Sequence, residues 1–102
     1  MTRPAVLTDA EVDAALAGLD SWSRDGDEII RAFECASFAD AVAFVVRIGF
    51  FAESANHHPD IDVRWRTVRV ALTTHDAGGL TALDLDLATR ITTAFAGFAK
   101  AG

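Results

Sequence analysis

The spacing of apolar residues along the chain predicts three helices and four strands. Helical spacing, with apolar residues three and four apart, covers 9–19, 38–55 and 82–99. Alternation of apolar and polar residues, as in strands with one buried face, covers 21–25, 28–35, 62–66 and 68–74. The order helix, hairpin, helix, hairpin, helix predicts an α+β fold, with a four-stranded antiparallel sheet and three helices packed on one face.

Capping signals mark the start of each predicted helix. Thr8, Ser37 and Thr81 each lie three residues before an acidic residue. In such a capping box the hydroxyl group accepts a hydrogen bond from a backbone N–H of the first turn, and the acidic side chain accepts one from the capping residue. The three boxes support the three helix assignments.

The two predicted hairpins rest on different signals. Asp25-Gly26 lies between the first two strands and favours a tight turn. In the second hairpin the alternation changes phase, because Val63 and Trp65 follow one parity and Val68 follows the other. A strand with one buried face cannot shift by one residue without exposing its apolar side chains. We therefore expect a turn or a bulge near Arg66-Thr67, and we favour the turn.

The second predicted helix carries more apolar residues than one sheet needs. We expect the sheet to be faced by Phe38, Val42, Val45, Ile48 and Phe51. The flanks then carry Phe44, Val46 and Phe50. Two explanations of this surplus remain open, namely self-association into a homodimer or homotetramer and packing against the other two helices within one subunit.

Composition limits the class of protein. The 102 residues suffice for one domain, assigned to residues 1–102, and 51% of them are apolar. A formal net charge of -6 argues against a nucleic-acid-binding face. The single cysteine, Cys35, excludes an intramolecular disulfide and fits a reducing cytoplasm. The chain lacks a long apolar run and a signal-peptide pattern, so we expect a soluble, cytoplasmic protein with no membrane partner.

All three histidines lie in one stretch of the chain. His57 and His58 are adjacent in Asn-His-His-Pro at a predicted helix end, and His75 follows the last predicted strand. The second hairpin would return His75 to the side of the pair. Imidazole groups exchange protons near neutral pH, so this cluster suits general acid/base catalysis. Pro59 stiffens the backbone after the pair. Glu53, one helical turn before His57, could hold that imidazole, and the alternative is an ordinary solvated charge at the helix end.

A metal site is the main alternative for this cluster, because three imidazoles can bind zinc. Adjacent residues point their side chains apart in most backbone conformations, and neither His-x-His nor His-x-x-x-His spacing is present. We therefore expect no metal and no other cofactor.

Four short motifs around the histidines form a specific combination. They are Ala52-Glu53, His57-His58-Pro59, the segment from Val68 to His75 that ends in Thr74-His75, and Gly79-Leu80-Thr81 followed by Asp84. In this combination the chain resembles the pterin-4a-carbinolamine dehydratases, also called 4a-hydroxytetrahydrobiopterin dehydratases. The resemblance is close from Phe33 to about Asp84 and covers the whole chain in layout. It implies the same fold that the apolar pattern predicts.

The resemblance also implies an activity. The substrate would be a tetrahydropterin with a hydroxyl group at C4a, which loses water to give quinonoid dihydropterin in recycling of the tetrahydropterin cofactor. His57, His58 and His75 match the three active-site histidines of the family. We expect His57 and His75 to exchange protons and His58 to position the pterin. The expected substrate-binding or orienting residues are Glu53, Pro59, Thr74 and Asp84.

Asp84 matches a family aspartate near the third histidine, and the resemblance implies that it orients His75. Helix capping is the alternative role for Asp84. Two departures affect the pocket, because animal members often carry aspartate where this chain has Asn56 and tryptophan where it has Ile61. Trp65 stands where the family often has tyrosine, and we expect it to be a packing residue.

A second function class stays open. Some animal members of the family bind a transcription factor and stabilise its dimer through a helical surface. The apolar second helix would suit a protein-interaction module of this kind, which would not need the histidines. Retention of all three histidines favours the enzyme.

Overall fold

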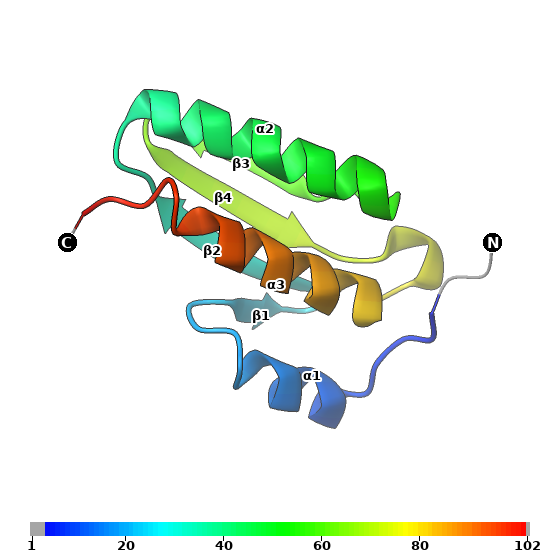
Figure 1. The fold of residues 1–102 in the computed structure, drawn as a ribbon. Helices are drawn as coiled ribbons and strands as arrows, with labels where there is room; N and C mark the ends of the chain where they lie inside the picture. Colours follow the sequence, from blue (N-terminus) through cyan, green and yellow to red (C-terminus); the bar gives the residue numbers. More distant parts are fainter. Residues whose placement is uncertain (1–3, 102) are drawn as a thin grey trace.

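The structure, a computed structural model, describes residues 4–101 and contains the three helices and four strands that the sequence predicts (Figure 1). The helices are α1 (Asp9–Leu16), α2 (Phe38–Ala55) and α3 (Ala82–Phe95). The strands are β1 (Ser23–Asp25), β2 (Glu28–Glu34), β3 (Asp60–Arg64) and β4 (Thr67–Leu72). A short 3₁₀ helix, η1 (His75–Ala77), follows β4.

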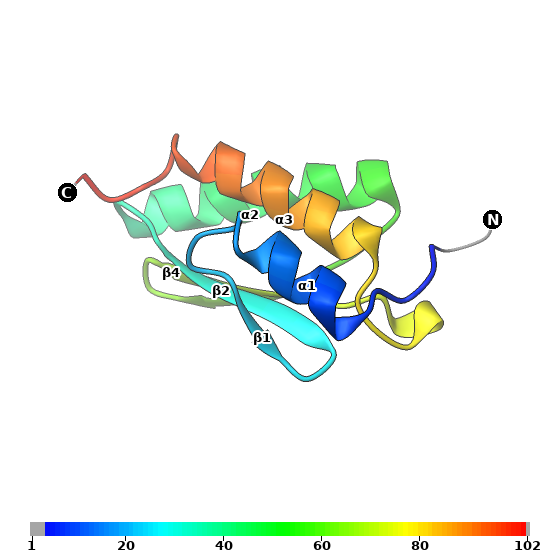
Figure 2. The same ribbon diagram turned by 90° about the horizontal axis from the view of Figure 1, so that it is seen from below.

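The strands form one antiparallel sheet in the order β1-β2-β4-β3. Figure 2 shows all three helices on one side of this sheet. The predicted α+β arrangement is therefore confirmed. Within residues 4–101, no helix has both the length and the apolar character that a membrane crossing requires.

The second hairpin turns at Trp65-Arg66. Arg64 pairs with Thr67, so two residues connect the strands, and Trp65 has a φ of 52°. Positive φ is what the tight turns of two-residue hairpins require. The predicted turn is confirmed and lies one residue earlier than expected. Val63 and Val68 pair directly across the strands, so they share one face of the sheet despite the change of phase.

Two helices end earlier than the apolar spacing predicts. α1 ends at Leu16 rather than at 19, and α3 ends at Phe95 rather than at 99. Beyond Phe95 the chain continues in a tighter turn, and the carbonyl group of Phe98 accepts a hydrogen bond from the N–H of Ala36. Leu19 and Phe98 still pack against the core, so the spacing correctly predicts burial but not helix.

The three predicted caps are present, but only two of the boxes are complete. Thr8 and Thr81 form reciprocal boxes with Glu11 and Asp84 at the starts of α1 and α3. At α2 the Ser37 hydroxyl group caps the Asp40 N–H, while the Asp40 carboxylate accepts from that same hydroxyl group rather than from the backbone.

The predicted orientation of α2 is wrong in part. Its buried residues are Ala41, Phe44, Ile48 and Ala52, whereas Phe38 and Val42 are exposed. Phe44 makes ring contacts with Phe33 of β2 and with Phe95 of α3. The inner face of α2 is therefore turned towards the gap between the sheet and α3. Helix packing within one subunit accounts for Phe44, but not for the apolar residues that stay exposed.

Candidate active site

Three chain segments meet at one end of the fold, where α2 ends, β4 ends and α3 begins (Figure 1). A cavity of about 230 Å³ lies at this junction. Its lining residues are Asn56, His57, His58, Thr73, His75 and Asp76. The fold thus brings the three histidines to one cavity, as their spacing in the sequence predicts.

The turn after α2 separates the environments of the two adjacent histidines. Asn56 adopts the left-handed conformation, with φ 48° and ψ 45°, and the N–H of His57 donates to the carbonyl group of Ala52. Such a cap reverses the chain at a helix end, and asparagine is one of the residues that tolerate it. The side chain of His57 is 5% exposed, whereas that of His58 is 58% exposed. Pro59 then disfavours any return to helix at His58.

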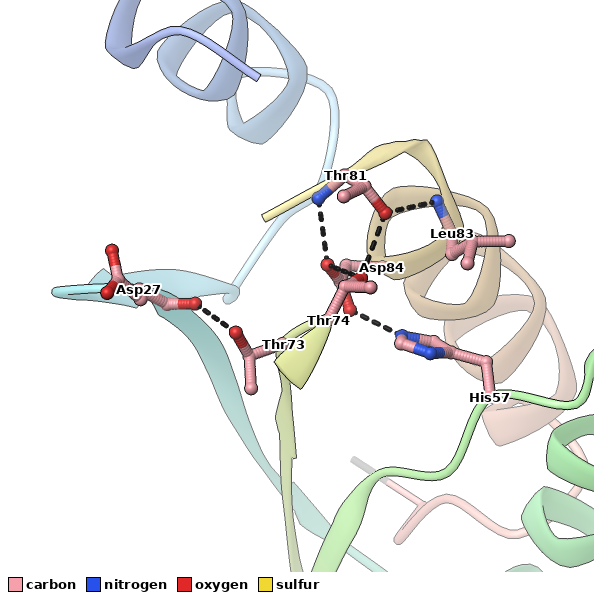
Figure 3. Close-up of polar contacts among 7 residues, drawn as sticks. All are labelled: Asp27, His57, Thr73, Thr74, Thr81, Leu83 and Asp84. Carbon is pink, nitrogen blue, oxygen red and sulfur yellow. Dashed lines mark hydrogen bonds and ion pairs between the residues drawn. The ribbon is translucent and has the colours of Figure 1, made fainter. Parts of the chain in front are cut away.

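A buried carboxylate holds His57. Nε2 of His57 lies 2.6 Å from Oδ1 of Asp84, which is fully buried in the first turn of α3 (Figure 3). The other oxygen, Oδ2, accepts hydrogen bonds from the hydroxyl group of Thr74 and from the N–H of Thr81. All these groups are shielded from water. In such a buried environment a hydrogen bond to a charged group is strong.

His58 has a carboxylate partner of its own, at the surface. Its Nε2 lies 2.6 Å from Oε2 of Glu53, whose side chain is 77% exposed. Solvent screens such a pair, so Glu53 can bias the orientation of His58 without fixing it.

Two pairings differ from those suggested by the sequence. Glu53 contacts His58 rather than His57, because the left-handed turn at Asn56 ends the helix and removes the one-turn relation. Asp84 contacts His57 rather than His75. The two roles considered for Asp84 are therefore compatible, because Oδ2 caps the start of α3 at the N–H of Thr81 while Oδ1 contacts His57.

His75 reaches the cavity from a short, hydrogen-bonded loop. It is exposed at the start of η1, and Thr74 before it exchanges backbone hydrogen bonds with Gly79. Gly78 closes η1 with a φ of 82°, a conformation that glycine adopts without strain. The hydroxyl group of Thr73 donates to the carbonyl group of Asp27 in the β1–β2 turn, which ties the loop to the sheet (Figure 3).

Three residues of the site were not selected from the sequence. Thr73 and Asp76 line the cavity, and the hydroxyl group of Thr81 lies 2.9 Å from that of Thr74. The only indication in the sequence that Thr73 and Asp76 belong to the site is their position on either side of Thr74-His75. The sequence does not indicate the contact of Thr81 with Thr74, because helix capping alone accounts for a threonine at position 81.

Metal-based and thiol-based chemistry have less support than proton exchange by the histidines. Among residues 4–101, no group of three or more histidine, cysteine, aspartate or glutamate side chains is arranged to hold a metal ion. Cys35 is buried in the core, and burial raises the pKa of its thiol, as do Asp40 and Glu34 to a smaller extent. The thiolate is the nucleophilic form, so Cys35 is a poor candidate nucleophile.

Comparison with known proteins identifies the family. The family described as pterin 4 alpha carbinolamine dehydratase matches residues 5–94. The chain belongs to this family. A relative from Roseiflexus sp. (strain RS-1) that carries the name pterin-4-alpha-carbinolamine dehydratase is 58% identical over 85 residues, which cover 83% of this chain and 91% of the relative. Membership of the pterin-4-alpha-carbinolamine dehydratase family places the chain among the hydro-lyases.

Two solved structures share the dehydratase fold. A transcriptional coactivator/pterin dehydratase from Brucella melitensis matches with a TM-score of 0.84 and 32% identity, over 86% of this chain and 96% of that one. A pterin dehydratase-like protein, identified as a RuBisCO assembly factor in the alpha-carboxysome, matches with a TM-score of 0.59 and 22% identity, over 76% and 89%. The second likeness shows the fold alone.

Proposed function

We propose that this chain removes water from a 4a-hydroxytetrahydropterin to give quinonoid dihydropterin, by proton exchange with histidine side chains. The observation that carries the proposal is the meeting of three histidines at one cavity of about 230 Å³, where buried Asp84 holds one of them. Family membership supports the class of substrate, and the cavity supports the chemistry.

The reaction needs one proton delivered and one removed. Protonation of the C4a hydroxyl group allows the C–O bond to break and water to leave, while loss of the N5 proton lets a double bond form between N5 and C4a. A protonated imidazole and a neutral imidazole on either side of the pterin suffice for both transfers. They exchange protonation states in each turnover and return to their starting states through solvent. We assign these transfers to His57 and His75.

The remaining site residues act by orientation. Exposed His58 positions the pterin, and Glu53 biases the imidazole of His58 through their 2.6 Å contact. Asp84 orients His57, and Thr74 orients Asp84 by donating to Oδ2. Pro59 acts on the backbone, because it disfavours a helical conformation at His58.

The test is a dehydratase assay on the purified protein with freshly generated 4a-hydroxytetrahydropterin. We expect the protein to accelerate dehydration, and a chelator to leave the rate unchanged. Loss of activity on chelation, with recovery on stoichiometric zinc, would contradict metal-free catalysis by the histidines.

The apolar surface that remains on α2 supports self-association. Its members, here called the α2 stripe, are Phe38, Val42, Val46 and Phe50, and they are between 45% and 71% exposed. Val63 and Trp65, on the hairpin that begins with the edge strand β3, are also exposed. Exposed apolar stripes and free sheet edges are typical contact surfaces between chains. We propose a homodimer or homotetramer in which a second copy of this chain covers the α2 stripe or the β3 edge.

A protein-interaction module is the second candidate function, and the same α2 stripe favours it. In that case the stripe would bind and stabilise a partner dimer, and the histidines would not be needed. The dehydratase assay separates the two functions. Sedimentation of the parent and of a variant with a charge on the α2 stripe adds a second criterion, because a homo-oligomer that dissociates in the variant uses the stripe itself, whereas a monomer leaves the stripe open to a partner.

We also propose that residues 1–102 act as a single domain and that the protein works in the cytoplasm. The four strands form one sheet, and all three helices contribute to one hydrophobic core together with β2 and β4. The only cysteine is a buried free thiol, which suits a reducing compartment.

A further inference from the structure

A pair of buried threonine hydroxyl groups lies next to the contact between Asp84 and His57. The Oγ1 atoms of Thr74 and Thr81 are 2.9 Å apart, and both residues are fully buried. Thr74 lies between β4 and η1, whereas Thr81 is the N-cap of α3. Figure 3 shows both grouped around the Asp84 carboxylate.

The direction of each hydrogen bond in this group follows from its donors. The N–H of Leu83 can only donate, so Oγ1 of Thr81 accepts there, at 3.2 Å. The single hydroxyl proton of Thr81 is then available to Oγ1 of Thr74, and that of Thr74 goes to Oδ2 of Asp84, at 2.8 Å. Oδ2 also accepts from the N–H of Thr81, at 2.9 Å. The two hydroxyl groups therefore form a chain of donors from Thr81 through Thr74 that ends at the carboxylate.

This arrangement determines which nitrogen atom of His57 carries a proton. An ionised carboxylate only accepts hydrogen bonds, and Oδ2 of Asp84 is already served by two donors. Oδ1 is also an acceptor, so Nε2 of His57, at 2.6 Å, has to be the donor. Nδ1 then carries the lone pair of the neutral imidazole and gains the second proton in the imidazolium form.

We propose that Thr74 and Thr81 are positioning residues that hold the Asp84 carboxylate as an acceptor against Nε2 of His57, so that Nε2 keeps its proton and proton exchange with a ligand in the cavity passes through Nδ1 alone. The tautomer assignment depends only on the hydrogen bonds. Its catalytic consequence rests on the proposed dehydratase function. The hydroxyl group of Thr81 thus has two roles, because it caps α3 and completes the donor chain to Asp84.

The N-terminus of α1 offers a matched control for capping. Thr8 forms the same reciprocal box with Glu11, but both residues are exposed and their box serves only α1. A Thr8→Val variant therefore loses a threonine cap without affecting the site. Any effect that Thr81→Val shows and Thr8→Val does not comes from the position of Thr81 rather than from capping in general.

The first test is ¹⁵N NMR of the histidine side chains in the unmodified protein, at a pH where His57 is neutral. The nitrogen shifts distinguish a protonated from an unprotonated ring position. We expect His57 to be protonated at Nε2 and unprotonated at Nδ1. A proton on Nδ1 with a bare Nε2 would overturn the proposal, whether or not the protein is a dehydratase.

The second test removes the hydroxyl groups and keeps the side-chain shape. Thr74→Val removes one of the two donors that hold Oδ2, so the Asp84 carboxylate is less firmly held against Nε2 of His57. A fraction of the opposite tautomer should then appear, and kcat should fall roughly tenfold, the loss expected when one hydrogen bond to a charged group is removed. KM should stay near its parental value, because Thr74 is fully buried. Thr74→Ser, which restores the donor, should return the tautomer and kcat towards parental values.

The variants also separate this proposal from the proposed function. A folded Thr74→Val protein with the parental ¹⁵N pattern and the parental kcat would overturn the positioning role. For Thr81→Val, a tautomer and a kcat no more affected than in Thr8→Val would reduce Thr81 to a cap. Absence of dehydration by the unmodified protein would refute the proposed function, while the NMR result would still decide the tautomer.

Discussion

Replacing Asp84 with asparagine tests how much the buried carboxylate contributes to turnover. Asp84 is fully buried and lies 2.6 Å from Nε2 of His57, so it acts on the histidine rather than on the pterin. Asparagine keeps the volume and one acceptor oxygen but loses the charge. Hydrogen bonds to charged groups contribute about 1.5–3 kcal/mol, which corresponds to a decrease of roughly 10- to 100-fold in kcat. The decrease should stay smaller than that of His57→Ala, which removes the proton carrier itself.

The measurement is the steady-state kcat and KM for dehydration by the parent and by Asp84→Asn, with circular dichroism to verify that the variant is folded. KM should be nearly unchanged, since no substrate contact is lost. Asp86→Asn is the matched control, because Asp86 lies two residues further along α3 and is exposed, so this variant should behave like the parent. A folded Asp84→Asn protein that keeps the parental kcat, or that changes only KM, would refute the orienting role.

Three other predictions address binding, assembly and the cysteine. His58→Ala should raise KM at least as much as it lowers kcat, and a loss confined to kcat would contradict a positioning role. Phe50→Asp introduces a charge into the α2 stripe at a position that is 71% exposed, and a charge is costly to bury between two subunits. Sedimentation should therefore show dissociation of the homo-oligomer, and an unchanged mass would exclude the α2 stripe from the contact. Burial raises the pKa of the Cys35 thiol, so a thiol reagent should label it only after unfolding, and rapid labelling of the folded protein would contradict that reasoning.

Sequence patterns within short segments predict most of the fold. The capping threonines mark where α1 and α3 begin, and the change of phase between Val63 and Val68 predicts the second hairpin. That hairpin, together with the Asn-His-His-Pro turn, also predicts that the histidines converge. These features can be predicted from the sequence because each depends on residues that are close to one another in the chain.

The missed features depend on contacts between distant segments. Phe44 is buried rather than Phe38 because α3 packs beside α2, which the spacing within α2 does not reveal. Asp84 pairs with His57 across 27 positions, and the capping pattern predicts only its backbone partner. Glu53 meets His58 because of the left-handed turn at Asn56, a single-residue conformation that helical spacing cannot anticipate.

The most direct test of histidine catalysis is the dehydration rate of a triple variant beside that of the parent. The variant carries His57→Ala, His58→Ala and His75→Ala; a second version with His57→Gln keeps a donor for buried Asp84 if the first is unstable. We predict a rate lower by about a hundredfold or more, with the circular dichroism spectrum retained. A folded triple variant that dehydrates the carbinolamine as fast as the parent would contradict the account.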